Sequence, residues 1–119
     1  MRRYFYFLGS GLLLLLGLAS AGAAELQPLL AAIQGVGPQG KGQAAAQRAW
    51  AELAKADVSD LPQVLAAMDQ GQPLVDNWIA TAVEAIVEHS TLHGGRLPVA
   101  ELERFATDAQ HASRGRRLA

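Results

Sequence analysis

The chain has 119 residues, of which 50% are hydrophobic, a formal net charge of −1 and no cysteine. This length allows one domain and excludes large two-domain catalysts. Without cysteine, the chain cannot form disulfides, thiolate metal sites or a thiol nucleophile. After residue 23, eight basic residues stand against eleven acidic ones. Because nucleic-acid-binding domains are usually basic, we expect no nucleic-acid partner.

The amino terminus has the composition of an export signal. A basic start, Met1-Arg2-Arg3, precedes fifteen mostly apolar residues over 4–18, and small residues fill 19–24. This order is typical of a cleaved secretory signal peptide. We predict a signal peptide over 1–23, cleavage after Ala21-Gly22-Ala23, and a mature chain that begins near Ala24 and is exported to the periplasm or the medium. The alternative is an uncleaved membrane tether, for which fifteen residues fall short of the roughly 20 that a spanning helix needs.

Residues 24–43 are predicted to form a short helix and a linker. The helix covers 25–34, with Pro28 in its first turn, and a glycine-rich stretch over 35–42 follows. The apolar positions of this helix recur at helical spacing and are Leu26, Leu29, Leu30 and Ile33.

The glycine-rich stretch also resembles a phosphate-binding loop. It satisfies G-x-G-x-x-G and all but the last position of G-x-x-x-x-G-K-[ST]. Pro38 removes a backbone N–H that such a loop would aim at phosphate, and Gly42 lacks the hydroxyl that would hold magnesium. A flexible linker explains the same residues, and we expect no cofactor.

The remaining segments predict helices throughout. Apolar side chains recur with a helical period over 43–56, over 61–70, from Pro73 to Gly94 and from Leu97-Pro98 onward. A further helical start follows His111-Ala112-Ser113. No segment alternates apolar and polar residues as a strand would, so the fold class is all-α.

One short pattern occurs twice. Leu61-Pro62, followed by Leu65 and Met68, recurs 36 residues later as Leu97-Pro98, followed by Leu102 and Phe105. Two helices in each period of this length are typical of a helical solenoid, in which antiparallel helix pairs stack in a row.

The first copy of that pattern resembles a HEAT repeat. The resemblance lies in Asp60-Leu61-Pro62-Gln63-Val64-Leu65-Ala66-Ala67-Met68-Asp69, in Pro73-Leu74-Val75, and in Ala82-Val83 and Ile86. In that family a Leu-Pro opens the first helix, an Asp and a Pro bracket the turn, and apolar residues line the second helix. The resemblance implies a solenoid that binds proteins. This chain departs from the family at Asp76, where an Arg of the inter-repeat Asp/Arg ladder is common.

More narrowly, residues 30–119 are similar to the amino-terminal region of large exported HEAT-repeat proteins of planctomycete-type bacteria. In those proteins the helices continue beyond this point and a β-rich region follows. We therefore assign 44–119 to a HEAT-like repeat domain that is truncated at its carboxyl end.

A metal site is the main catalytic alternative. His89 and His93 are four residues apart on one helix, with Glu84 and Glu88 nearby, so the two imidazoles could share a zinc ion. The order is not the H-E-x-x-H motif, which places a base beside the metal. Solvated residues at a helix end explain the pattern without a ligand.

Aromatic and basic residues offer two further alternatives. Trp50 and Trp78 could line a ligand groove, but both lie on apolar helical faces and are assigned to the core. Three arginines, Arg114, Arg116 and Arg117, could contact an acidic partner, but a solvated or ion-paired face is the favoured interpretation. The predicted core residues are Trp50, Leu53, Leu61, Leu65, Met68, Trp78, Ile79, Ala82, Ile86, Leu102 and Phe105.

Taken together, these features predict a non-catalytic, exported scaffold or protein-binding module without cofactor or metal. The alternatives are a metal-dependent enzyme that uses Glu88, His89 and His93, and a membrane-tethered structural module. The segment after His111 is too short to be expected to pack as a helix, which would leave the stripe around Phe105 open on one side. We therefore also expect self-association through the carboxyl-terminal helices.

Overall fold

The computed structural model describes the backbone of residues 21–119 and the side chains of residues 25–119. Helices and turns make up these residues, which contain no strand, and the predicted all-α class is confirmed. In chain order the elements are α1 (Ala21–Gln34), η1 (Pro38–Gly40), α2 (Gln43–Leu53), η2 (Val58–Asp60), α3 (Leu61–Ala66), α4 (Pro73–Leu92), α5 (Val99–Thr107) and α6 (Ser113–Leu118), where η1 and η2 are 3₁₀-helices.

Two helix boundaries differ from the prediction. α1 begins at Ala21, so that Pro28 lies within the helix rather than in its first turn. α3 ends at Ala66 rather than near Gln70. The chain beyond α3 continues in tight turns, because the N–H of Ala67 and those of the residues after it bond to carbonyls three positions back instead of four.

The glycine-rich stretch is a folded turn, not the flexible linker that its composition suggested. The Gly37 N–H donates to the Lys41 carbonyl at 2.9 Å, and the Lys41 N–H donates to the Pro38 carbonyl at 3.3 Å. Gly42 has a φ of +72°, and a Cβ there would lie 2.6 Å from the Gly35 oxygen. Only glycine fits this position, which aligns the chain for entry into α2.

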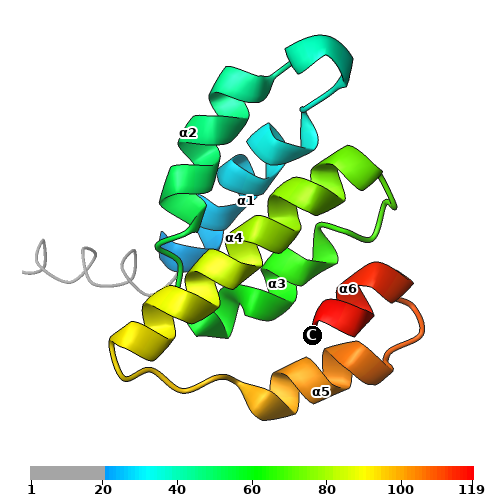
Figure 1. Cartoon of the computed structure of the whole chain (residues 1–119). Helices are drawn as coiled ribbons and strands as arrows, with labels where there is room; N and C mark the ends of the chain where they lie inside the picture. Colours follow the sequence, from blue (N-terminus) through cyan, green and yellow to red (C-terminus); the bar gives the residue numbers. More distant parts are fainter. Residues whose placement is uncertain (1–20) are drawn as a thin grey trace, which may run out of the picture.

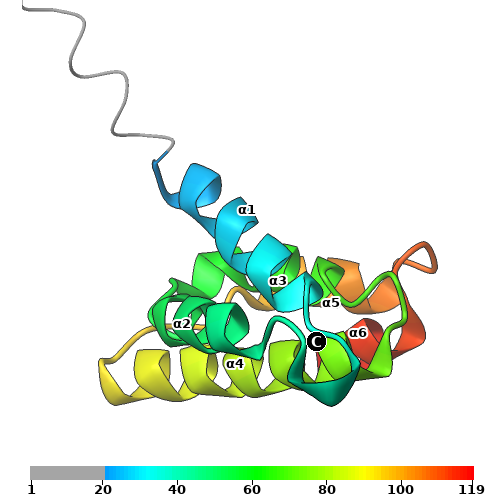
Figure 2. The same ribbon diagram turned by 90° about the horizontal axis from the view of Figure 1, so that it is seen from above.

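The helices pair in chain order (Figure 1). α1 packs against α2, α3 against α4, and α5 against α6, while α4 also contacts α1 and α2, and α3 contacts α5 and α6. Seen from above, α1, α3 and α5 lie toward one side of the molecule, and α2, α4 and α6 lie toward the other (Figure 2). The second helices of the pairs therefore share one face.

A single apolar core runs between these two sides. Eight of the eleven predicted core residues are buried: Leu53, Leu61, Leu65, Met68, Ile79, Ala82, Ile86 and Phe105. Trp50, Trp78 and Leu102 are only partly buried and pack against the edge of the core, which corrects the prediction for these three. The prediction omitted other core residues, namely Leu26, Leu30, Ile33, Ala46, Ala49, Val64, Ala67, Val75 and Val83.

The carboxyl-terminal segment packs, contrary to expectation. Residues 113–118 form α6, and Gly115 in this helix is buried against Phe105 and the Leu65 carbonyl. A Cβ on Gly115 would lie 3.2 Å from that carbonyl oxygen, which is tighter than most Cβ contacts, so a larger residue would push α6 away by a few tenths of an ångström. Phe105, expected to be open on one side, is 5% exposed.

The predicted signal peptide lies almost entirely outside the described residues. Only Ala21-Gly22-Ala23, the expected cleavage site, falls within them, on the first turn of α1. Over residues 21–119, no helix combines the length and the apolar character needed to cross a membrane.

Candidate functional site

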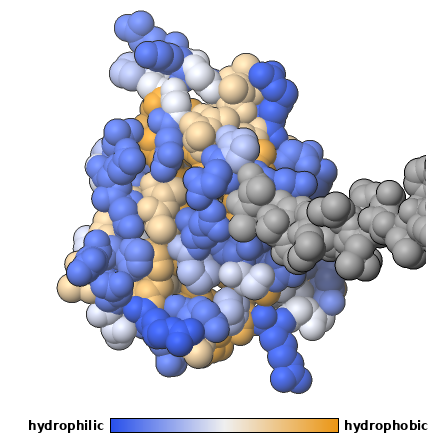
Figure 3. Space-filling model, turned by 180° about the vertical axis from the view of Figure 1, so that it is seen from behind, coloured by the Kyte–Doolittle hydropathy of each residue, from blue (hydrophilic) through white to orange (hydrophobic). Residues whose placement is uncertain are grey.

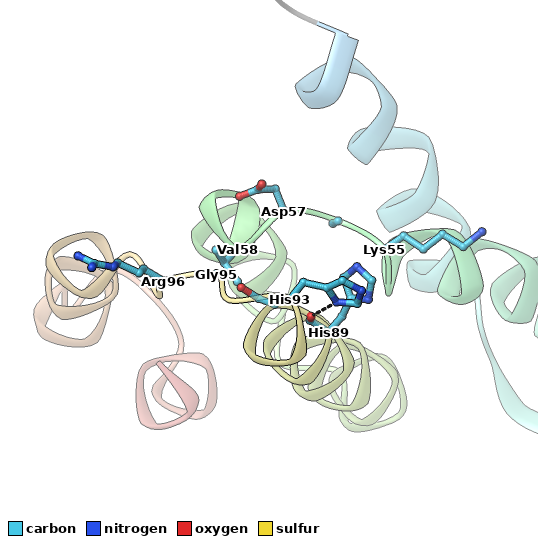
Figure 4. Close-up of a pocket in the computed structure, with 9 residues that line it drawn as sticks. Lys55, Asp57, Val58, His89, His93, Gly95 and Arg96 are labelled. Atoms are coloured by element: carbon cyan, nitrogen blue, oxygen red, sulfur yellow. Dashed lines mark hydrogen bonds between the residues drawn. The ribbon is translucent and has the colours of Figure 1, made fainter.

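The two histidines of the proposed metal site lie together at the carboxyl end of α4 (Figure 4). Their ring centroids are 4.3 Å apart, and His93 Nδ1 donates to the His89 carbonyl at 2.8 Å. Because a carbonyl can only accept, this bond places a proton on Nδ1 of His93. The pair borders a surface hollow of about 420 Å³ between α4 and the segment that connects α2 to η2.

The other polar side chains around this hollow do not converge on the imidazoles. Figure 4 shows Lys55, Asp57 and Arg96 pointing away from the two rings. Within the described part of the chain, no three His, Asp or Glu side chains come close enough to hold a metal ion. Among these residues, Glu84 and Glu88 do not form a group of three ligands with His89 and His93.

Asp57 has a structural role at this edge. Its carboxylate accepts a hydrogen bond from the Ser59 N–H at 2.9 Å and thereby caps η2. Hydrogen bonds from the Ser59 backbone and side chain lower the pKa of Asp57 below its ordinary value of 3.8. A carboxylate in this role stabilises the chain that leads into α3.

A second hollow of about 410 Å³ lies on the shared face of α2 and α4. Its aromatic walls are Trp50 from α2 and Trp78 from α4, and Leu74 beside them is 43% exposed. We call this surface the tryptophan face, defined by Gln47, Trp50, Leu74, Asn77, Trp78 and Thr81. None of these six residues is charged.

The Trp50 indole is tied to the backbone of α4 through one hydroxyl. Trp50 Nε1–H donates to Thr81 Oγ1 at 3.0 Å, and the Thr81 hydroxyl donates to the Trp78 carbonyl at 2.9 Å. These bonds orient Trp50 across the gap between α2 and α4. The sequence assigned both tryptophans to the core; in the structure each packs on the core with one side and lines the hollow with the other.

The glycine-rich turn borders the same region. Trp78 and Leu74 also line a neighbouring hollow of about 310 Å³, whose other wall is formed by residues 36–43, including Lys41. The stretch that resembles a phosphate loop therefore lies beside an apolar surface, with an exposed ammonium group at its end.

Of the three arginines singled out in the sequence, Arg114 is tied to α4. Its Nη2 donates to Asn77 Oδ1 at 2.6 Å, and its Nη1 lies 4.0 Å from Asp76 Oδ2. Asp76 is buried, and its Oδ1 has no hydrogen-bond partner among the described residues. Arg116 is partly buried and Arg117 is exposed. The ion-paired interpretation therefore fits Arg114.

Sequence reasoning missed a polar contact between distant turns. Asp69, which follows α3, accepts from the Ala112 N–H at 3.0 Å and from His111 Nδ1–H at 2.8 Å. The His111 ring also stacks on Phe105, with centroids 3.8 Å apart. The contacting residues are more than 40 positions apart, so no local sequence pattern marks the contact. The repeated Leu-Pro pattern could have indicated that the two turns are neighbours.

Comparison with known proteins gave no match to any family model, curated protein or solved structure. Figure 3 shows the molecule from behind, where hydrophilic side chains stand beside strips of apolar ones. The tryptophan face, with its two indoles around one hollow, is the candidate site that the geometry supports best.

Proposed function

We propose that this chain is a non-catalytic, exported helical-repeat scaffold of HEAT type that binds protein through its tryptophan face. The observation that carries the proposal is the pair of half-buried tryptophans around an uncharged apolar hollow, with the Trp50 indole held by its hydrogen bond to Thr81. Tryptophan is enriched among the residues that dominate protein–protein binding energy, because it removes a large apolar area from water while retaining one polar atom.

The pairing of the helices supports the repeat interpretation. A solenoid stacks helix pairs so that each pair contacts its neighbours and the second helices line one surface. Here the pairs follow chain order, and the contacts between pairs join α4 to α1 and α2 and α3 to α5 and α6. The two Leu-Pro segments stand before or at the start of α3 and α5, the first helices of successive pairs.

Two polar contacts between successive pairs support the same interpretation. Asp69 bonds to the turn before α6, and Asp76 near the start of α4 faces Arg114 near the start of α6. Asp76 stands where the resemblance would have an Arg, but a carboxylate and a guanidinium still meet between the second helices of two pairs.

The binding function can be tested by photo-crosslinking in cells of the organism that produces the protein. A photoreactive amino acid is placed at Leu74 on the tryptophan face or, as a control, at Val99 on α5. Both are exposed aliphatic residues in the first turn of a helix, 43% and 58% exposed respectively, so accessibility does not favour Leu74.

We expect a discrete protein adduct from position 74, identified by mass spectrometry, and little or none from position 99. Equal labelling at both positions, or no protein adduct at either, would refute binding through the tryptophan face.

A further inference from the structure

We propose that the partner on the tryptophan face is a second copy of this chain, bound across a twofold axis with the two α4 helices antiparallel. This inference rests on the proposed function and specifies its partner. It uses a different surface from the carboxyl-terminal helices, which the sequence had suggested for self-association.

The charges along α4 favour a copy over an unrelated partner. Beside Leu74 and Trp78 stands the exposed ammonium of Lys41, whereas Glu84 and Glu88 are exposed on later turns of α4. Their spacing of three and seven residues from Thr81 places them on the ridge that continues the tryptophan face. The surface is thus positive at one end, apolar in the middle and negative at the other.

A twofold axis through the apolar centre brings the positive end of each copy opposite the negative end of the other. It sets Lys41 of one copy toward Glu84 of the other, twice in each dimer, while the tryptophans meet in the middle. A partner of uniform charge would be attracted at one end and repelled at the other. Two other cations near the surface are paired with carboxylates and leave this pattern unchanged: Arg114 lies 4.0 Å from Asp76, and Lys55 lies 3.4 Å from Glu52.

The uncharged polar groups of the face fit the same arrangement. Gln47 and Asn77 carry amides, and an amide has both donors and an acceptor, so it can pair with another amide across a symmetry axis. A carboxylate or an ammonium group could not pair with its own copy in this way.

The size of the surface sets the expected affinity. Residues 74–88 of α4 span about 21 Å, with α2 alongside, which is at or below the small end of stable interfaces. We therefore expect a reversible dimer with a dissociation constant on the order of tens of micromolar.

Analytical ultracentrifugation of the purified protein, in the form in which the cell produces it, tests the inference. Leu74→Glu should raise the dissociation constant tenfold or more, because it introduces a charge into the apolar centre. Val99→Glu, a matched change on α5, should leave the constant within about twofold. Circular dichroism of each variant establishes that it remains folded.

Charge reversal provides a second, independent readout. Lys41→Glu alone and Glu84→Lys alone should each weaken the dimer about threefold to tenfold, while the double variant should recover most of the affinity, because each reversed lysine meets a reversed glutamate. Recovery of this kind is specific to the antiparallel pairing.

Three results would overturn the inference: a protein that remains monomeric up to about 1 mM, a dimer that Leu118→Glu on α6 disrupts while Leu74→Glu does not, or a double variant no better than the singles. If the protein is monomeric but position 74 still forms an adduct with another protein in the cell, the proposed function stands and only the second copy is excluded.

Discussion

The α3–α4 pair and the α5–α6 pair are held in place by different kinds of contact. Between α3 and α4 the contact is apolar, with Leu65, Met68 and Ile79 almost completely buried. The α5–α6 pair buries one large side chain, Phe105, and is otherwise fixed by polar contacts to Asp69 and α4.

This difference predicts which helices should unfold together and which should open separately. Apolar burial contributes roughly in proportion to area and is shared by every element that borders the core. A few polar contacts at partly exposed positions contribute less, and they fix geometry more than free energy. We therefore expect α5 and α6 to open before the rest of the described structure unfolds.

Ile79→Ala tests the apolar contact between α3 and α4 and should have the largest effect on stability. Ile79 is completely buried, and truncation leaves a cavity, so we expect a loss of about 4 kcal/mol in the free energy of unfolding. Chemical denaturation monitored by circular dichroism measures it. The control is Leu92→Ala on the same helix, where 75% of the side chain is exposed and the change should be within about 0.5 kcal/mol.

Phe105→Ala tests the other pair and should have a smaller, more local effect. Loss of the ring removes both the contact with Gly115 and the stacked His111, at a cost of about 3 kcal/mol. Hydrogen exchange should show that α5 and α6 lose protection while α3 and α4 retain theirs. A uniform loss of protection over all four helices would mean that the two pairs form one cooperative unit.

Helical periodicity predicted much of this architecture, but not what lies between helices. The stripes of α3 and α4 identified residues that are buried, because each apolar repeat has a neighbouring helix to cover it. The same rule placed Trp50 and Trp78 in the core, since periodicity gives the direction of a side chain and not the number of helices packed around it. The packing of α6 over Phe105 was not predicted for the same reason. Gly115 lets α6 approach closely, and this role becomes clear only once the Leu65 carbonyl is known to lie beside Gly115.

Asp69→Asn tests the polar contacts that hold the α5–α6 pair in place. One oxygen remains to accept from the Ala112 N–H, but the charge opposite His111 is lost. Because the Asp69 and His111 side chains are 33% and 25% exposed, solvent screening reduces the contribution, and we expect a loss of about 1 kcal/mol. Asp69→Ala should cost more than Asp69→Asn, and equal costs would show that the Ala112 bond contributes nothing.

Asp57→Ala should have the smallest effect, and its pH dependence identifies the cause. Asp57 caps η2, which leads directly into α3, and removal of a capping side chain costs about 1 kcal/mol or less at an exposed position. Its pKa is lowered in the folded protein by hydrogen bonds from Ser59, so the native state favours the charged carboxylate. That contribution is complete well above pH 3.8, the ordinary value, and disappears as the pH falls through the lower pKa of the folded state.

The difference in the free energy of unfolding between wild type and Asp57→Ala should therefore be constant near neutral pH and shrink below pH 3.8. Asp57→Asn keeps a hydrogen-bond acceptor and should stay closer to wild type at neutral pH. A difference that persists unchanged into strong acid would mean that the side chain acts through packing, and that the boundary between α2 and α3 depends on the same apolar contacts as the core.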